Sequence, residues 1–296
     1  MVNISGDDCI ELLRVGERPL MKESFVARAL ASWYYQLKIL FSYKMHLALE
    51  MMDIILSALI YYFVSFLVSP QDLVALGYSP DYVAFSISGI ALSRYIWTSV
   101  SRLARKMHHE ISAGTFESLV AVDTDNFHSW LIGQVLYGFT WSSMWFIGTL
   151  IIGFVLGAGF TSDPWIWIQA GIVVILVVIV HSAIGIMAAG MYIVHKQLET
   201  MLVLMSTVIE FFGGVIYPLS ILLNYPILYY ISLLMPFTHG LELFRRAIID
   251  GTPIYSLGML VHLSVLLLFL PLVYVGFKVF ERYLNLAKKN ALLSVY

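Results

Sequence analysis

Six long apolar stretches dominate this 296-residue chain and limit what it can fold into. A helix needs about 20 apolar residues to cross the hydrocarbon core of a bilayer. Every backbone polar group in hydrocarbon must be satisfied within the structure, which only helices and closed barrels achieve. Because the apolar runs are continuous rather than alternating, they exclude a barrel. The predicted spans are residues 47–68, 83–101, 130–158, 166–194, 200–222 and 256–279.

The composition favours an all-α polytopic membrane protein and excludes several other classes. Hydrophobic residues make up 60% of the chain and charged residues 12%, against about 45–50% and about 25% in soluble domains. The 17 Lys and Arg nearly balance the 19 Asp and Glu, so no basic excess is present to neutralise the phosphates of a nucleic acid. The single cysteine, Cys9, excludes an internal disulfide framework. Residues 1–46 lack the apolar core and cleavage site of a signal peptide.

Basic residues predict the orientation, because Lys and Arg are enriched in cytoplasmic loops. Of the 17 basic residues, 14 lie in the first tail, the loop after the second span, the connection between the fourth and fifth spans, or the region after the sixth span. The loops near residues 70–82 and 159–165 contain none. We therefore expect a multi-pass protein of the plasma membrane with both termini in the cytosol.

Three basic residues fall outside this pattern. Arg94 lies inside the second span, and Arg245 and Arg246 follow the fifth span on the predicted outer side. Glu242 is one helical turn before Arg246 and can pair with it. We expect this local pair and the outer lipid headgroups to satisfy both outer arginines.

Residues 25–44 follow an N-terminal tail of residues 1–24 and predict an amphipathic helix on the inner membrane surface. The apolar residues at helical spacing are Val26, Leu30, Trp33, Leu37 and Leu40. A solvated helix that leads into the first span is the alternative. The six-span domain would then cover residues 45–296, including a C-terminal tail of residues 280–296.

The polar loop of residues 102–129 predicts a short helix between the second and third spans. The second span can continue into water until Gly114 breaks the helix, and Thr115 can cap a new one. The apolar residues on one face of that short helix are Phe116, Leu119 and Val120. A two-turn helix is not stable alone in water, so we expect this face to bind a partner. A connector packed against the rest of the chain is the alternative.

Residues 213–251 stay apolar past the fifth span but contain repeated helix breakers. These are Gly213, Gly214, Pro218, Pro226 and Pro236. Because Pro and Gly interrupt helices, we expect this segment to enter the outer leaflet and return as short helices.

Three polar side chains fall inside the predicted spans, namely Arg94, His181 and Glu210. Such groups are costly in hydrocarbon unless they face the bundle interior or a water-filled path. Arg94 and Glu210 form the obvious candidate ion pair. A structural tether between the second and fifth spans is favoured over a substrate route, because buried charges are usually paired.

No catalytic or metal site is predicted. The chain contains no G-x-x-x-x-G-K-[ST] motif, so it has no loop of that type to hold nucleotide phosphates. His108, His109 and Glu110 are adjacent residues that point in different directions on a helix, and no further ligands occur at a usable spacing. No nucleophile, base and orienting group stand out together in the spans.

Two stretches resemble the permeases of type-2 ABC exporters. In that family a Glu and a Gly-Thr-x-Glu-x-Leu run precede the third span, and the matching residues are Glu110, Gly114, Thr115, Glu117 and Leu119. The closing signature of the family is similar to a set formed by Gly213, Gly214, Pro218, Pro236, Thr238, Glu242, Arg245 and Gly251. The resemblance covers nearly the whole chain. One departure is that Asp123–Asn126 stands where the family commonly has a proline.

The resemblance implies a permease subunit that exports substrate by alternating access. Two copies of a cytosolic ATPase subunit would bind ATP and Mg, and a second permease copy or close relative would complete the transporter. The chain itself would bind no cofactor. The short helix would couple to the ATPase through Phe116, Leu119 and Val120. Glu117 and the flanking basic residues Arg102, Arg105 and Lys106 would orient it by charge.

The substrate expected from the sequence is lipophilic, drug-like or lipid-linked. A polysaccharide or lipid-linked glycan is the alternative, because the 18 Tyr and 18 Phe could stack on sugars. An ion-coupled secondary transporter and a structural membrane scaffold are the alternatives from other classes.

Overall fold

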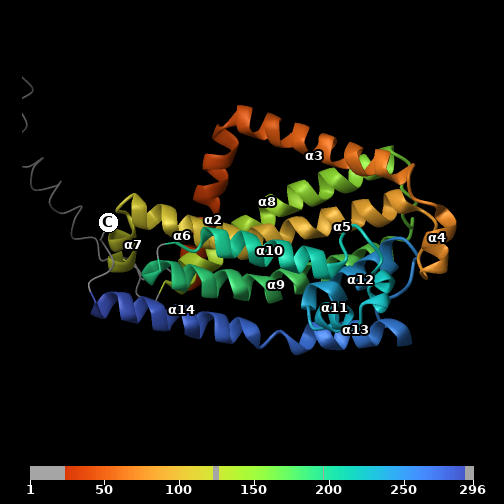
Figure 1. Ribbon diagram of the computed structural model, residues 1–296. Coiled ribbons are helices and arrows are strands. Elements are labelled where there is room, and N and C mark those ends of the chain that lie inside the picture. The colour runs from red at the N-terminus through yellow and green to blue at the C-terminus, as the bar shows by residue number, and fades with distance from the viewer. Residues whose placement is uncertain (1–23, 123–126, 196, 291–296) are drawn as a thin grey trace, which may run out of the picture.

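The computed structural model describes residues 24–122, 127–195 and 197–290, in which every regular element is a helix (Figure 1). The α-helices are α2 (Phe25–Ser42), α3 (Lys44–Ser65), α4 (Pro70–Ala75), α5 (Tyr82–Trp97), α6 (Leu103–Ser112), α7 (Phe116–Val122), α8 (His128–Val155), α9 (Pro164–Val194), α10 (Glu199–Gly213), α11 (Pro226–Leu233), α12 (Pro236–Ile248), α13 (Leu257–Leu268) and α14 (Leu272–Lys289). A π-helix, η1 (Thr98–Arg102), joins α5 to α6, and a 3₁₀-helix, η2 (Leu219–Asn224), follows α10. The predicted all-α class is confirmed.

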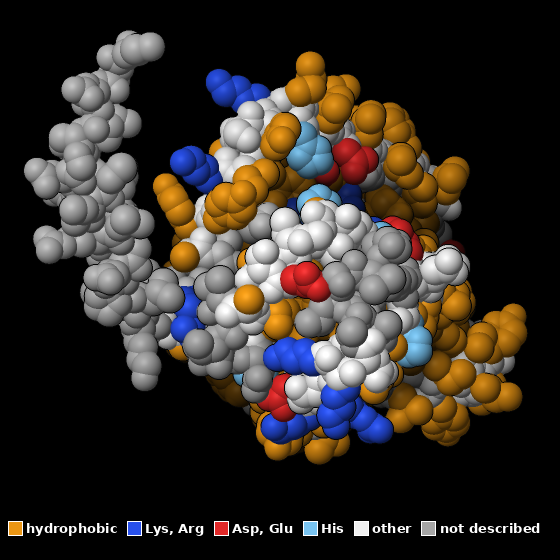
Figure 2. All heavy atoms as spheres, turned by 90° about the vertical axis from the view of Figure 1, so that its left-hand side faces the viewer, with side chains coloured by type: hydrophobic (Ala, Val, Ile, Leu, Met, Phe, Trp, Pro, Cys, Tyr) orange, Lys and Arg blue, Asp and Glu red, His pale blue; other side chains and the backbone are white. Residues whose placement is uncertain are grey.

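The long helices run side by side between two ends of the molecule (Figure 1). We call these the α7 end and the α4 end, after the short helix at each. Figure 2 looks onto the α7 end, where Lys, Arg, Asp, Glu and His side chains gather while hydrophobic side chains cover the flanks. This distribution is compatible with a protein whose flanks face lipid.

Four helical stretches of the described chain are long and apolar enough to cross a membrane: Lys44–Ser65, His128–Val155, Pro164–Val194 and Leu257–Lys289. The pair α11 and α12, bent by 82°, would add a fifth if it counted as one span. The predicted second and fifth spans fall on α5 and α10, which have only 16 and 15 residues. Several apolar helices therefore agree with a membrane protein, and the number six stays a prediction.

Helix α9 lies at the centre of the bundle. Of its most apolar window, 67% is buried inside the protein, against 11% for α3. Helices α6, α12 and α14 pack around it, together with η1. Gly185 permits the contact with η1, because a Cβ atom there would lie 1.8 Å from the Ser99 carbonyl oxygen. This close helix seam lies within one chain.

Helices α2 and α3 lie on the outside of the bundle and meet at Tyr43. Helix α2 packs on α8, where Trp33 Nε1 donates to Thr140 Oγ1 at 3.0 Å and Gln134 Nε2 donates to Ser32 Oγ at 3.1 Å. Helix α3 diverges from α5 and α8 toward the α7 end (Figure 1). The predicted helix at residues 25–44 is present but ends at Ser42, where the chain turns into α3.

The break predicted in the loop after the second span is present. Helices α5 and α6, with η1 between them, form one continuous helical rod that ends at Ser112. Gly114 has a φ of +71°, which favours glycine. Helix α7 begins two residues later, at Phe116. Asp123–Asn126, where the chain departs from the family pattern, lies outside the described residues.

The second predicted break is also present, and a buried arginine holds it. Helix α10 ends at Gly213, and Gly214 takes a φ of +66°. Arg245 of α12 is 2% exposed and donates to the carbonyl oxygens of Gly214, at 2.7 Å, and Val215. It also donates to the Phe85 carbonyl of α5, at 3.2 Å. The prediction that lipid headgroups satisfy Arg245 is wrong, because the interrupted helix offers it unpaired carbonyl acceptors inside the protein.

The other signature residues shape the same turn. Pro218 directly precedes η2 and Pro236 is the first residue of α12, a position where the missing N–H has no helical partner to lose. Thr238 Oγ1 donates to the carbonyl oxygen of Phe212, one residue before the end of α10, at 3.3 Å. The predicted pair forms between Arg246 Nε and Glu242 Oε1 at 2.9 Å.

Candidate functional site

Three cavities follow one another along the rod formed by α5, η1 and α6. The α6 cavity, of about 340 Å³, is lined by basic and amide side chains that include Arg102, Arg105, Lys106, His109, Gln36 and Gln134. The tryptophan cavity, of about 290 Å³, is lined by Trp97, Trp141, Trp145, His46, Glu50 and Arg94, among others. The Glu210 cavity, of about 350 Å³, is lined by Glu210, Tyr61, Ser93, Thr207 and Tyr217, among others.

Neighbouring cavities share walls. Thr98, Arg102 and Arg105 line both the α6 cavity and the tryptophan cavity. Arg94 and Trp97 line both the tryptophan cavity and the Glu210 cavity. The cavities therefore form a series along the rod, from α6 to the broken end of α10.

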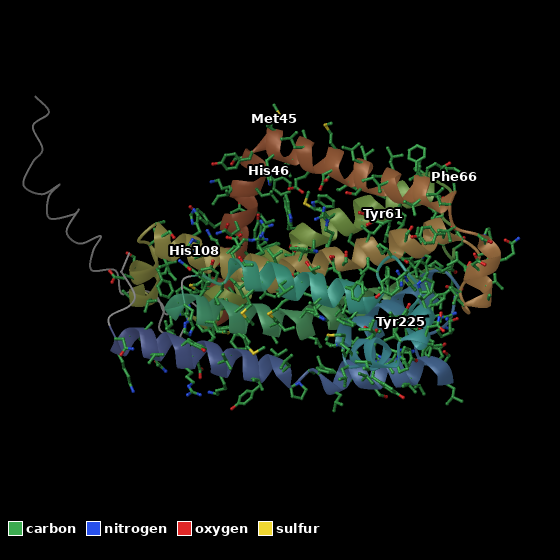
Figure 3. The ribbon with its side chains drawn as sticks, viewed as in Figure 1. Met45, His46, Tyr61, Phe66, His108 and Tyr225 are labelled. Carbon is green, nitrogen blue, oxygen red and sulfur yellow. The ribbon has the colours of Figure 1, made fainter. Side chains whose placement is uncertain are left out.

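Helical spacing explains why these side chains line one path. Arg94, Thr98 and Arg102 are four residues apart, which places them on one face of a helical rod. The facing aromatic stripe on α8 has the same spacing and consists of Tyr137, Trp141 and Trp145. Sequence reasoning missed this second stripe, although its i, i+4 spacing was visible. Figure 3 shows His46 and Tyr61 on the inner side of α3, whereas Met45 points outward.

Charged groups of α3 tie that helix to α5 and α8 in the tryptophan cavity. Arg94 Nη2 lies 3.1 Å from Asp53 Oδ2, and its Cζ lies 3.5 Å from the centroid of the Trp145 ring. Trp145 Nε1 donates to Glu50 Oε2 at 2.6 Å. This network joins a cation, two carboxylates and an indole between three helices.

The predicted ion pair between Arg94 and Glu210 is wrong. In the described chain its salt bridge is with Asp53 rather than Glu210. The Glu210 carboxylate lines the adjoining cavity, where it interacts with Trp97, Ser93 and, at longer range, Arg94. Helix α3 brings a carboxylate to the level of Arg94, and the hydropathy pattern does not reveal that approach.

His181, the third polar residue of the predicted spans, lies apart from this network. It is fully buried, and its Nδ1 lies 2.7 Å from the Val177 carbonyl oxygen. Its ring meets Phe237 of α12 edge-on, with the centroids 5.9 Å apart. The structure therefore places His181 in the packing between α9 and α12 and not on the cavity walls.

Arg102 stands at the wall shared by the α6 and tryptophan cavities. Its Nη2 donates to Tyr137 Oη at 2.7 Å, and its Cζ lies 5.0 Å from the Trp141 ring centroid. In the described residues no carboxylate lies within 4.0 Å of it, whereas Lys106 pairs with Glu110 at 2.7 Å. Arg102 is thus a half-buried cation whose nearest partners are neutral.

The turn between α6 and α7 is held by Glu110. Lys106 Nζ lies 2.7 Å from Glu110 Oε1, and the Thr115 hydroxyl donates to the other carboxylate oxygen. Burial alone would raise the pKa of Glu110, but hydrogen bonds from Lys106 and Thr115 and the charge of Lys106 outweigh it and lower the pKa. The carboxylate form therefore stabilises the turn.

The prediction that Phe116 faces a partner protein is wrong. It is fully buried, and its ring meets Phe127 edge-on with the centroids 5.5 Å apart. Phe127 in turn stacks on Phe280 of α14. Leu119 and Val120 are partly buried against the same core. The apolar face of α7 therefore anchors this helix to its own chain, whereas Glu117, Ser118 and Ala121 are exposed.

We expect Glu110→Gln to reduce the loss of stability on acidification. A carboxyl whose pKa is lowered by folding stabilises the protein above its ordinary pKa of 4.5, and this contribution is lost as the pH falls below that value. Thermal midpoints of the purified protein should fall less for the variant than for wild type between neutral and acid pH. Glu117→Gln, at an exposed site on α7, is the control and should behave as wild type. Equal acid sensitivity of the Glu110 variant and wild type would contradict the role of Glu110.

Within residues 24–122, 127–195 and 197–290, no group of three or more His, Cys, Asp or Glu side chains could hold a metal ion. The ring of His108 lies against Tyr192 of α9, with the centroids 5.0 Å apart. Cys9 lies outside the described residues.

Comparison with known proteins adds no family assignment. No protein-family model matches the chain, and no curated protein matches it. The basis for a function is therefore the geometry of the cavities and of the α6–α7 turn.

Proposed function

We propose that this chain is the transmembrane permease subunit of an ABC exporter in the plasma membrane, with both termini in the cytosol. The series of three cavities, each lined in part by charged side chains in an otherwise apolar bundle, carries the proposal. Charged side chains within such a bundle mark a substrate or ion path. The substrate would be lipophilic, drug-like or lipid-linked, with a polysaccharide or lipid-linked glycan as the second choice.

Helix α7 would couple this path to ATP hydrolysis on a separate subunit. Its buried side anchors it through Phe116, while Glu117, Ser118 and Ala121 are exposed. The turn at Glu110 connects α7 to α6, whose residues line the first cavity. A force on α7 would therefore reach the cavity wall through one turn of chain. Two ATPase copies would bind ATP and Mg, and a second permease copy would complete the transporter.

Ion-coupled secondary transport is the second candidate function. The specific observation that favours it is Glu210, a carboxylate that lines a cavity beside Arg94, because coupling ions are commonly bound by such groups inside the bundle. A structural scaffold is less well supported, since it would need no series of adjoining cavities with charged walls.

A matched pair of substitutions, each replacing an alanine by tryptophan, tests the permease proposal. Ala121 on α7 and Ala75 on α4 are both exposed and lie at opposite ends of the molecule. We expect Ala121→Trp to reduce co-purifying ATPase activity by about tenfold or more, because a bulky side chain would obstruct a docked subunit. Ala75→Trp should retain that activity, and both variants should keep the wild-type thermal midpoint.

Two results would contradict the proposal. Equal ATPase recovery with Ala121→Trp and Ala75→Trp would remove α7 as the docking helix. Substrate transport by the purified chain alone, driven by an ion gradient without ATP, would favour the secondary transporter.

A further inference from the structure

We infer that the α6 cavity binds an amphiphile, with its phosphate-class anionic headgroup against the basic side chains of the wall and its adjoining apolar segment against apolar side chains of the same wall. The inference rests on the proposed transport function, because it treats the connected cavities as a substrate path. It adds the charge and shape of the ligand, which the sequence alone left open.

The charge of the α6 cavity favours an anion. Its wall contains Arg102, Arg105, Lys106 and His109, and no Asp or Glu side chain lines it. Carboxylates that do not line the cavity partly neutralise the charge of two of these cations. Lys106 has Glu110 as its partner, and Arg105 Nη1 lies 3.9 Å from an oxygen of Glu199.

Arg102 is the member of this group that best suits an anionic ligand. It has five N–H donors, and the hydrogen bond it makes within the described chain goes to the neutral hydroxyl of Tyr137. Guanidinium groups bind phosphate oxygens through two parallel hydrogen bonds. Gln36, Gln134 and Ser182 add uncharged polar groups to the same wall, which suits a phosphate ester with several oxygens.

Leu103, Val135 and Phe139 line the same cavity as the cations, which suits an apolar segment beside the headgroup. In the tryptophan cavity the indole faces already contact other groups, which disfavours a stacked sugar. Sugar stacking needs an open aromatic face, but Trp145 is covered by Arg94, whose Cζ lies 3.5 Å from the ring centroid. Trp141 is stacked on His46, with an interplanar angle of 3° and centroids 5.6 Å apart, and it also contacts Arg102.

Binding of tritiated dodecyl phosphate to the full chain in phosphatidylcholine nanodiscs tests the inference. We expect saturable binding that Arg102→Gln weakens by about tenfold or more, because a charged hydrogen-bonding partner is lost. Arg282→Gln is the matched control: it removes the same charge from an exposed site on α14 outside the cavities and should leave the affinity within about twofold. Scintillation proximity on loaded and empty nanodiscs measures the specific signal.

If Arg102→Gln fails to fold, displacement of the probe from the wild-type protein by unlabelled compounds tests the inference instead. Unlabelled dodecyl phosphate should displace the probe at about tenfold or more lower concentration than dodecyltrimethylammonium or dodecanol. Equal displacement by all three would overturn the anionic site. Displacement by inorganic phosphate as effective as that by dodecyl phosphate would assign the site to the free ion and overturn the amphiphile.

This assay uses neither ATP nor an ATPase subunit, so its outcome is separate from that of the permease proposal. Wild-type affinity of the Arg102→Gln variant would overturn the ligand assignment. The proposal that an ATPase docks on α7 would be unaffected. Specific binding by a chain with which no ATPase activity co-purifies would support the ligand site and contradict the exporter.

Discussion

Gly185→Ala should lower the thermal midpoint of the full-length protein by roughly 6–12 °C, the largest effect expected of a single methyl group in this chain. The new Cβ atom would lie 1.8 Å from the Ser99 carbonyl oxygen and 3.0 Å from the Ser99 carbonyl carbon. These are backbone atoms of η1, so no side-chain rotation relieves the clash. Helix α9 and the rod formed by α5, η1 and α6 would have to separate by more than an ångström.

The physical reason for the size of this effect is the central position of α9. Helices in lipid gain stability chiefly from close packing, which small residues at the crossing permit. Forcing extra volume into such a contact costs about 1–3 kcal/mol and occasionally more. Ser99 also lines the α6 cavity, so the displacement would widen a wall of the proposed binding site.

Gly171→Ala is the control on the same helix. A Cβ atom at Gly171 meets no atom within 4 Å, and alanine favours a helix over glycine by about 1 kcal/mol. We therefore expect an unchanged or slightly higher midpoint, measured by fluorescence-detected size exclusion after heating. Equal midpoints for the two variants would show that α9 and η1 do not approach as closely as described.

Phe116→Asp should release α7 from the bundle and accelerate amide hydrogen exchange in residues 116–122 by at least about tenfold. Loss of a buried Phe side chain costs about 3–5 kcal/mol, and the new carboxylate would lie in an aromatic site beside Phe127, which stacks on Phe280. The charge reaches water only if α7 moves away from α14. Hydrogen exchange with mass spectrometry measures the change locally.

Ser118→Asp provides the matched control, because it adds the same charge at an exposed position of α7. Its exchange rates should stay within about twofold of wild type. Slow exchange in Phe116→Asp would contradict the anchoring role of Phe116. Loss of ATPase binding in the Phe116 variant would follow from a displaced helix, so Ala121→Trp is the better probe of docking.

Features that depend on neighbouring residues could be predicted from the sequence. The helical class follows from continuous apolar runs, and the breaks at Gly114 and Gly214 follow from the backbone freedom of glycine. The pair of Glu242 and Arg246 also follows from their separation by one helical turn. Each of these features is determined within about one turn of chain.

Tertiary structure alone decided which helix faces meet. It paired Arg94 with Asp53 instead of Glu210, turned Phe116 into the core, and gave Arg245 the carbonyls of a broken helix instead of lipid headgroups. It also brought the basic face of the α5–α6 rod against the aromatic stripe of α8, which created the cavities. The physical reason is that lipid-facing and protein-facing sides of such helices are both apolar. Hydrophobic periodicity therefore leaves the rotation and the neighbours of each helix open.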